Sequence, residues 1–406
     1  MTTGPDDPPN SALPLADIRV LDISTLFAGP YAAQLLADFG ADVVKVEHPS
    51  GDPLRGYGHS HQGVPLAWKV VNRNKKGIAL DLKDAADRER FLGLAAQADV
   101  VIENFRPGTL ESWGLGPDVL HEHNPRLVIT RVTGFGQDGP YARRAGFGTL
   151  AEAMSGLVAM SGGPDGPPQL PAFPAADAFA GVQAAYATLI AVHARDAIGK
   201  GQVVDISITE SMIGALGAQL TVYDTLAIKP ERVGNASRSS APRNVYQCAD
   251  GRWVAVSAPA RAVAERVVRL VGRGDLAEQP WFASGMGRVE HRAVIDDAVG
   301  RWIAARERPA VIAAFEAVAA AVAPIYEVDD VLADPHFQAR DLVVRVPDAE
   351  LGSVLMPNVP FRLSETPGRV RWAGPRLGEH RDEVFGILDE PHDNAAPTDE
   401  RERTQR

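Results

Sequence analysis

Residues 18–47 read IRVLDISTLFAGPYAAQLLADFGADVVKVE, and this stretch decides the fold class. The apolar runs Ile18–Ile23 and Asp42–Val46 predict two buried strands. Between them, Tyr31–Phe39 predicts a helix that ends at Gly40, because glycine is common just past a helix end. A strand, a helix and a second strand in so short a length form a βαβ unit, whose two strands run parallel.

The same alternation continues along the first half of the chain. Further strands are predicted at Ile78–Leu82, Val100–Glu103, Leu127–Val132 and Val203–Ile208, and a further helix at residues 84–97. Strands that alternate with helices predict an α/β fold with a largely parallel sheet covered on both faces.

A second module is predicted near residue 240. The segment VYQCADGRWVAVSA, residues 245–258, predicts a hairpin that turns at Asp250-Gly251. Helices are predicted after it at Val263–Val271, His291–Arg306 and Ala310–Ala321. Residues 1–13 and 390–406 are rich in Pro, Asp and Asn or in charge, and are predicted to be disordered tails.

Composition excludes several classes of protein. The chain has 45% hydrophobic and 23% charged residues, which is ordinary for a soluble globular protein. Its net charge is −11 and no Lys/Arg stripe is present, so nucleic acid is not an expected partner. The single cysteine, Cys248, excludes an internal disulfide framework, and no Cys/His spacing fits a zinc site. We expect no metal, no membrane span or signal peptide, and a cytoplasmic location.

The loops after the predicted strands are the expected ligand-binding region, because open parallel sheets bind ligands at the carboxyl ends of their strands. These loops are rich in Gly and Pro and lie near six basic residues: Arg55, Lys75, Lys83, Arg106, Arg143 and Arg144. The chain has no G-x-G-x-x-G after its first strand, no phosphate-binding P-loop and no G-x-S-x-G elbow. A nicotinamide enzyme, a P-loop nucleotidase and a serine hydrolase therefore lack their best support.

Asp177 is the candidate catalytic residue. It lies in PAFPAADAFAGVQAAYATLIAVHAR, residues 171–195, where a proline-rich turn leads into a long apolar helix. An aspartate there commonly caps the helix, because its carboxylate accepts unpaired backbone N–H groups. A carboxylate is also a nucleophile in covalent catalysis. The local residues leave both roles open, with capping the commoner one.

Several segments taken together resemble one family, the class III (CaiB/BaiF-type) coenzyme A transferases, which are related to formyl-CoA and carnitine-CoA transferases and to α-methylacyl-CoA racemase. The segments include LFAGPYAAQLLADFGADVVKVEHPSGDPLR (26–55), NRNKKGIALDLK (72–83), DVVIENFRPGTLESWGL (99–115), TGFGQDGPYARRAGFGTLAEAMSGL (133–157) and PAADAFAGVQAAYATLIA (174–191). They occur in order over nearly the whole chain, so the set is specific although each segment alone is weak.

The resemblance implies a fold and an assembly. It implies a large Rossmann-like domain made from the first half and the returning C-terminus, a small inserted α+β domain, and an interlocked homodimer. The implied boundaries are 14–234 for the first part of the large domain, 235–322 for the small domain, 323–345 for a linker and 346–389 for the return.

The resemblance also implies roles for individual residues. Asp177 matches the catalytic aspartate of the family. The residues expected to bind coenzyme A are Ala28, Leu80, Lys83, Asn104, Phe105, Arg106 and Phe147. Coenzyme A and acyl-CoA are expected as substrates, with no permanently bound cofactor.

The implied activity is transfer of coenzyme A from an acyl-CoA donor to a free carboxylic acid, through an aspartyl anhydride and an aspartyl-CoA thioester. The alternatives are a 2-methylacyl-CoA racemase or epimerase and a non-catalytic acyl-CoA-binding protein. Phe147 stands where the racemases carry a histidine, which favours the transferase. Gly148 replaces an acid found in many transferases. A dicarboxylic substrate is a further hypothesis, with its second carboxylate held by Arg143, Arg144, Arg238 or Arg243.

Overall fold

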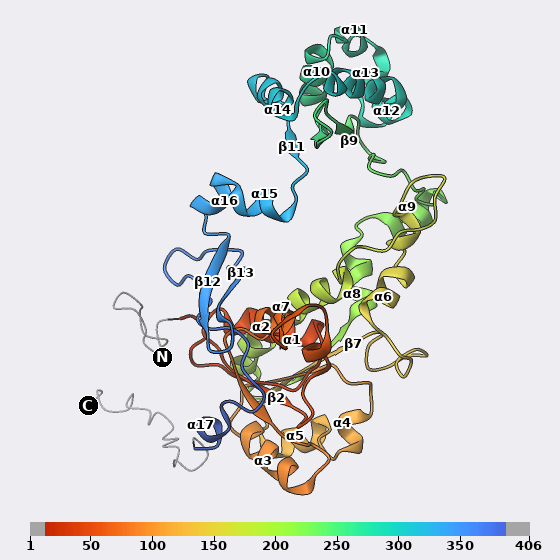
Figure 1. Cartoon of the computed structure of the whole chain (residues 1–406). Helices are drawn as coiled ribbons and strands as arrows, with labels where there is room; N and C mark the ends of the chain where they lie inside the picture. The colour runs from red at the N-terminus through yellow and green to blue at the C-terminus, as the bar shows by residue number, and fades with distance from the viewer. Residues whose placement is uncertain (1–12, 387–406) are drawn as a thin grey trace, which may run out of the picture. The chain divides into compact units, whose positions relative to one another are not determined.

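The computed structural model describes residues 13–386, so the predictions for the two tails lie almost wholly outside the described residues. Figure 1 shows the chain coloured from its N-terminus to its C-terminus. Contacts within the chain divide it into two compact units. Unit 1 comprises the residues up to Ala151, Pro174–Met212 and the residues from Asp341 onward. Unit 2 comprises Glu152–Phe173 and Ile213–Arg340.

Six parallel strands form the main sheet of unit 1, in the spatial order β5-β2-β1-β6-β7-β8. Their bounds are Arg19–Asp22 (β1), Asp42–Glu47 (β2), Lys75–Ala79 (β5), Val100–Glu103 (β6), Val128–Thr133 (β7) and Val203–Ser207 (β8). Numbered along the chain, these strands lie in the order 3-2-1-4-5-6, which is that of a Rossmann-like sheet. The predicted α/β class with a parallel sheet is confirmed. The order reverses between β1 and β6, where such sheets bind ligands.

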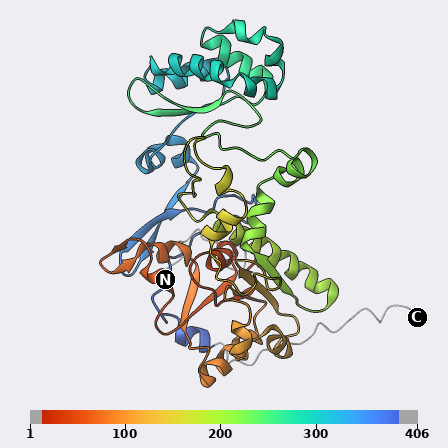
Figure 2. The ribbon, with the colours of Figure 1, turned by 90° about the vertical axis from the view of Figure 1, so that its right-hand side faces the viewer.

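Helices cover both faces of this sheet, as Figures 1 and 2 show from two directions. One face carries α1 (Ala28–Ala37), α2 (Leu66–Val71) and α7 (Ala175–Ile198). The other carries α3 (Ala85–Ala95), α4 (Thr109–Ser112) and α5 (Pro117–His123). Strands enclosed on both faces need apolar residues on both sides, which explains their nearly continuous hydrophobic runs.

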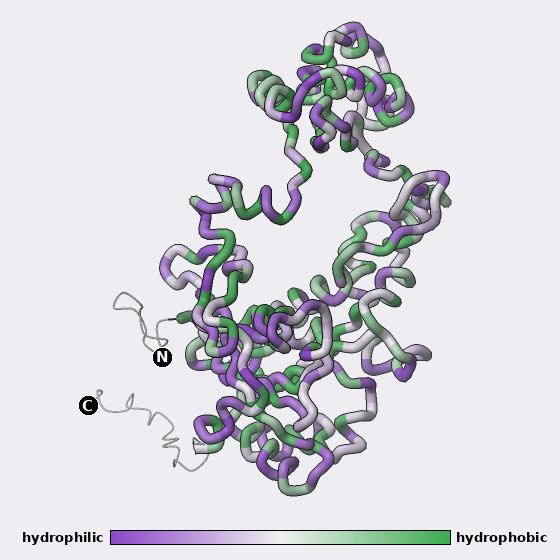
Figure 3. The backbone as a smooth tube through the Cα atoms, viewed as in Figure 1, coloured by the Kyte–Doolittle hydropathy of each residue, from purple (hydrophilic) through white to green (hydrophobic). Residues whose placement is uncertain are grey.

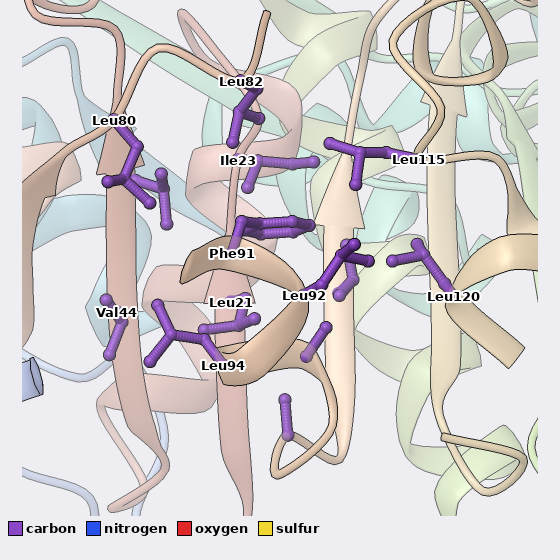
Figure 4. Close-up of a cluster of buried hydrophobic side chains, with 14 of the residues drawn as sticks. Leu21, Ile23, Val44, Leu80, Leu82, Phe91, Leu92, Leu94, Leu115 and Leu120 are labelled. Carbon is purple, nitrogen blue, oxygen red and sulfur yellow. The ribbon is translucent and has the colours of Figure 1, made fainter. Parts of the chain in front are cut away.

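Buried apolar side chains fill the space between the sheet and α3 (Figure 4). Phe91 and Leu92 of α3 pack in one cluster with Leu21 of β1 and Val44 of β2. Asp84 begins α3 by accepting two backbone N–H groups of the first turn. Each such apolar side chain contributes about 1.5–3 kcal/mol when it leaves water. This core fixes the strands and thereby the loops at their carboxyl ends.

Helix α7 is unusually long and apolar. It is the one described helix long and apolar enough to cross a membrane by length and composition, and 39% of that apolar window is buried. The core helix of a soluble protein meets the same test. Here α7 packs along α1, β7 and β8 within unit 1.

The chain from Asp341 onward completes unit 1. It forms the hairpin β12 (Val343–Asp348) and β13 (Gly352–Pro357) and the helix α17 (Arg381–Gly386), which packs against β5. Buried polar groups attach it: the Trp68 indole N–H donates to the Pro375 carbonyl at 2.7 Å. Lys69 also pairs with Asp348 at 2.7 Å.

Unit 2 holds the predicted hairpin, in which β9 (Arg243–Gln247) pairs with β10 (Trp253–Ser257) across Asp250-Gly251. A third antiparallel strand, β11 (Val322–Pro324), pairs with β10. Five helices follow β10: α10 (Arg261–Leu270), α11 (Gly274–Ala277), α12 (Gly285–Glu290), α13 (Arg292–Ala304) and α14 (Arg308–Ala317). In Figure 3 hydrophobic and hydrophilic stretches alternate along them, as in helices with one face on a core.

The division by contacts differs from the predicted domain boundaries. Residues 152–173 and 213–234, predicted for the large domain, group with unit 2. The predicted linker at 323–345 contains α15 (Val328–Ala333) and α16 (Pro335–Ala339). Composition changes only near residue 240, so it carried no signal for the earlier change in contacts.

Some element bounds differ from those predicted. The strand predicted at Ile78–Leu82 is β5, Lys75–Ala79, because buried Lys75 belongs to the strand although its charge suggests a loop. The helix predicted from Tyr31 begins at Ala28. The remaining elements are β3 (Ser60–His61), β4 (Val64–Pro65), α6 (Gly148–Met154), α8 (Ile208–Ala215) and α9 (Gln219–Leu226), with 3₁₀ turns at Pro53–Gly56, Val158–Met160 and Pro280–Ala283.

Candidate active site

A pocket lies at the carboxyl ends of β1, β6 and β7, where the strand order reverses. Residues 25–28 after β1, residues 104–107 after β6 and the loop after β7 form its wall. Asp177, in the first turn of α7, completes the wall. Among the described residues that line this pocket, Asp177 is the one carboxylate and no histidine is present.

Asp177 is not the N-cap residue of α7. The position before the first helical residue is Pro174, which offers no side-chain hydrogen bond, and Asp177 is the third residue of α7. The helix begins directly after the proline, two residues before Asp177, so Asp177 does not occupy the entry position at which an aspartate commonly caps a helix. The half-buried carboxylate lies instead beside the positive end of the helix dipole, which stabilises its negative charge.

The loops around the pocket are tied together by Asn104. Its side-chain oxygen accepts the Thr25 N–H at 2.7 Å, and its amide group donates to the Thr25 carbonyl at 2.7 Å. The next backbone N–H, of Phe105, is held by Glu103 at 2.6 Å, and Arg131 donates to the same carboxylate. Burial raises the pKa of Glu103 although Arg131 opposes this shift. The two loops at the switch point therefore form one hydrogen-bonded wall.

The structure gathers most of the predicted site residues. Ala28, Asn104, Phe105, Arg106 and Phe147 line the pocket together with Asp177.

Leu80 and Lys83 do not line this pocket. Leu80 is 1% exposed and lies in the core, and its backbone N–H donates to the Glu47 carbonyl at 2.9 Å. The Lys83 ammonium lies 5.8 Å from the centre of the Trp113 ring, which packs edge-on against Phe105 at 5.0 Å. Binding of coenzyme A by Leu80 and Lys83 stays a prediction.

The four arginines considered for a second carboxylate belong to different units. Arg144 lines the pocket of Asp177, and Arg143 lines a neighbouring hollow that shares Pro107 and Ala142 with it. Arg238 and Arg243 belong to unit 2, where each donates to a backbone carbonyl of that unit.

Gly148 packs directly on the Asp177 carboxylate, a contact that sequence reasoning missed. A Cβ at this position would lie 2.2 Å from Asp177 Oδ2 and 2.7 Å from its Cγ. Gly134 and Gly146 also pack backbone against backbone, since a Cβ on either would lie 2.6–2.7 Å from the other's Cα. The glycines of GFGQDG and AGFG were the available signal: they allow the loop after β7 to close over Asp177.

A buried cluster of four charges supports the loop after β1 and was also missed. Asp22, Lys45, Asp52 and Lys75 have side chains at most 1% exposed. Lys45 lies 3.1 Å from Asp52 and Lys75 lies 2.8 Å from Asp22. Burial lowers the pKa of Lys75 to about 8, although Asp22 opposes this shift. The signal was charged residues inside apolar strands, in VLDI and VVKVE.

This cluster contacts the backbone of the loop after β1 and of the first turn of α1. Lys45 donates to the Ser24 carbonyl, and Lys75 donates to the Pro30 carbonyl at 2.7 Å. Asp52 accepts the N–H of Leu26 at 3.1 Å, and Leu26 has a φ of 63°, which a leucine rarely adopts. The charges therefore hold a strained loop that forms part of the pocket wall.

Comparison with known proteins identifies the family. The sequence profile described as CoA-transferase family III matches residues 15–381. This chain belongs to that family. Succinyl-CoA–D-citramalate CoA-transferase of Chloroflexus aurantiacus is 43% identical, over 92% of this chain and 94% of the relative. Succinate–glutarate CoA-transferase of Agrobacterium fabrum is 35% identical, over 96% of this chain and 100% of the relative.

A solved structure agrees with this assignment. The crystal structure of a CAIB/BAIF family protein from Brucella suis has a TM-score of 0.83 and 33% identity, and it covers 93% of this chain and 100% of that chain. The protein is therefore a CoA-transferase, and CoA thioesters are substrates of this class. Within residues 13–386, no group of three His, Cys, Asp or Glu side chains is placed to hold a metal ion.

Gly148→Ala tests whether catalysis depends on the position of the Asp177 carboxylate: if that carboxylate reacts, kcat should fall by about 10²-fold, the cost of misplacing a reacting group by about an ångström. The new methyl group would displace the Asp177 carboxylate. Gly214→Ala is the matched control, because a Cβ on this helical glycine meets no atom within 4 Å. Steady-state kinetics with calorimetric titration of coenzyme A measure both effects. A wild-type kcat in Gly148→Ala would show that catalysis does not depend on this space.

Proposed function

We propose that this CoA-transferase exchanges coenzyme A between short dicarboxylic acids through covalent intermediates on Asp177. The observation that supports the mechanism is the single carboxylate in a pocket at the switch point of the sheet. The names of the relatives above support the substrate class, since they give succinyl-CoA, D-citramalate, succinate and glutarate. All four are dicarboxylic acids or a thioester of one.

The first half of the reaction releases the donor acid. An oxygen of the Asp177 carboxylate attacks the thioester carbonyl of the acyl-CoA, the C–S bond breaks, and the thiolate leaves with the electron pair. The product is a mixed anhydride between Asp177 and the acyl group. The thiolate then attacks the Asp177 carbonyl of the anhydride and expels the donor as a carboxylate. Asp177 now carries coenzyme A as a thioester.

The second half repeats these steps in reverse with the acceptor. The acceptor carboxylate attacks the Asp177 thioester, expels the thiolate and forms a new anhydride. The thiolate then attacks the acceptor carbonyl, which releases the Asp177 carboxylate unchanged and yields the new acyl-CoA. No proton is transferred between carbon atoms and no external oxidant or water is consumed. One carboxylate is therefore sufficient as the covalent catalyst.

The pocket favours transfer over the racemase alternative. A racemase needs a second acid or base opposite the first, so that a proton can leave and return at the α-carbon. Phe147, which matches the position of that second group in the racemases, lines the pocket and is 58% exposed. A phenylalanine side chain cannot take up a proton.

Coenzyme A is proposed to enter with its thioester end at Asp177. Ala28, Phe105 and Phe147 offer apolar contacts in the wall, and Arg106 offers positive charge at its edge. The proposal needs no permanently bound cofactor.

We expect two chains to form an interlocked homodimer in the cytoplasm. An apolar face on α7 supports the dimer: Phe179, Val182, Tyr186 and Ile190 recur at helical spacing and are 45–67% exposed in the single chain. Light scattering coupled to size-exclusion chromatography is expected to give the molar mass of two chains. A monomer at micromolar concentration would contradict the dimer.

The experiment that tests the function is a matrix of acyl-CoA donors against free acids, read by mass spectrometry of the acyl-CoA products. Succinyl-CoA with dicarboxylic acceptors is expected to give the highest rates. Deuterium exchange at the α-carbon without exchange of coenzyme A would support the racemase instead. Binding of acyl-CoA without either reaction would support a non-catalytic binding protein.

A further inference from the structure

The charges that line the pocket are few, and they define which acid fits. Besides Asp177, the described lining residues include two cations, Arg106 and Arg144. Arg106 belongs to ENFRPG, the segment whose resemblance implies coenzyme A binding. Arg144 belongs to the loop after β7 that closes over Asp177. The two cations therefore reach the pocket from different walls.

Arg144 is held in place by an aromatic ring. Its guanidinium carbon lies 3.7 Å from the centre of the Tyr141 ring, and that ring packs edge-on against Phe135 at 5.9 Å. The Arg144 backbone N–H donates to the Tyr141 carbonyl at 2.8 Å, which closes the turn between them. Stacking restrains the flat face of a guanidinium but leaves its N–H edge available for a carboxylate.

The guanidinium of Arg144 has no internal carboxylate to bind. Within residues 13–386 the Arg144 guanidinium makes no ion pair and no side-chain hydrogen bond. The guanidinium of Arg131, by contrast, forms ion pairs with Glu103 and Glu111. A second carboxylate that enters a partly enclosed pocket loses hydration and needs a counter-charge. Arg144 offers that charge in a restrained position.

We propose that Arg144 binds the free second carboxylate of the dicarboxylic substrate while the first carboxylate reacts at Asp177. This inference rests on the proposed function, and it assigns the recognition of dicarboxylic substrates to one residue, Arg144. Of the four arginines considered, Arg144 is the one among the described residues that line the pocket of Asp177, whereas Arg143 lines the neighbouring hollow. A monocarboxylate of equal length would react without using Arg144.

The test compares succinate with butyrate as acceptors, both with the same acyl-CoA donor, so that effects on the donor cancel in the ratio. Arg144→Met is expected to lower kcat/KM for succinate by about 10²-fold, the scale of a lost charge-assisted hydrogen-bonded pair. The value for butyrate is expected to change less than about 3-fold. Arg144→Lys is expected to recover part of the preference, because lysine keeps the charge without the planar fork.

Two further variants separate the alternatives. Arg143→Met, one residue away in the sequence, is expected to keep the ratio of succinate to butyrate. Arg106→Gln is expected to weaken coenzyme A binding equally for both acceptors. If Arg144→Met leaves the ratio of kcat/KM for succinate to kcat/KM for butyrate unchanged, whether or not both values fall, the role of Arg144 is overturned.

Failure of this inference is distinct from failure of the proposed function. Coenzyme A on Asp177 is read directly by mass spectrometry of the intact wild-type protein incubated with succinyl-CoA. If the adduct and exchange are present but the acceptor ratio does not depend on Arg144, only the recognition role fails. If neither the adduct nor exchange is found with any acid, the proposed function itself fails.

Discussion

Asp177→Asn is expected to lower kcat for coenzyme A exchange by about 10⁴- to 10⁶-fold, the range seen when a covalent catalytic group is removed. The asparagine amide keeps the size of the side chain but is a poor nucleophile, so neither the anhydride nor the thioester forms. The pocket wall offers no substitute, because Asp177 is its one carboxylate among the described lining residues. Stopped assays of acyl-CoA products measure the loss.

Binding and folding are expected to survive this change. Asp177 is the third residue of α7, whose N-cap position is Pro174, and asparagine keeps a side-chain oxygen in a side chain of the same size. Calorimetric titration of coenzyme A and circular dichroism are expected to match the wild type. Asp118→Asn, at an exposed position of α5 outside the pocket, is the matched control and should exchange normally. Ordinary exchange by Asp177→Asn would rule out the covalent mechanism.

The sequence predicted the strands correctly where their buried residues are apolar. The runs at Val100–Glu103 and Leu127–Val132 match β6 and β7 to within a residue, because strands enclosed on both faces must be continuously apolar. β5 was misplaced because its first residue, Lys75, is charged and fully buried. A single sequence does not reveal the partner, Asp22, that makes this burial tolerable.

The site was predictable only in part. The rule that ligands bind at the carboxyl ends of strands placed the pocket correctly, since the walls are the loops after β1, β6 and β7. The local sequence at Asp177 favoured a cap, and only the resemblance to the family led to the prediction that Asp177 is catalytic. The contact between Gly148 and Asp177 joins residues 29 apart in the sequence, and no local pattern encodes such a distance. The stacking of Arg144 on Tyr141 likewise depends on how one loop folds.

Lys45→Met is expected to destabilise unit 1 by about 3–5 kcal/mol, the cost of leaving a buried charge without its partner. Methionine fills similar space, so the loss arises mainly from charge. Asp22 and Asp52 hold the pKa of Lys45 above its usual value although burial opposes this shift, which shows that they favour the charged amine. In the wild type the Asp52 carboxylate accepts the Leu26 N–H at 3.1 Å. Without Lys45 this buried carboxylate would lack its cationic partner. Urea denaturation of unit 1, followed by tryptophan fluorescence, measures the loss.

The double variant Lys45→Met/Asp52→Asn separates charge from packing. Asparagine keeps an oxygen that can accept the Leu26 and Leu54 N–H groups but carries no charge, so the double variant is expected to be more stable than Lys45→Met alone. Burial raises the pKa of Asp22, but Lys45 and Lys75 together hold it below its usual value. In Lys45→Met the pKa of Asp22 should therefore rise, and the stability that its charged form contributes in the wild type should be lost in the variant as pH rises between the wild-type and variant pKa values. The destabilisation should therefore be smaller at pH 5 than at pH 7. Additive effects with no pH dependence would show that Lys45 acts through packing alone, and that the loop after β1 does not depend on the buried charges.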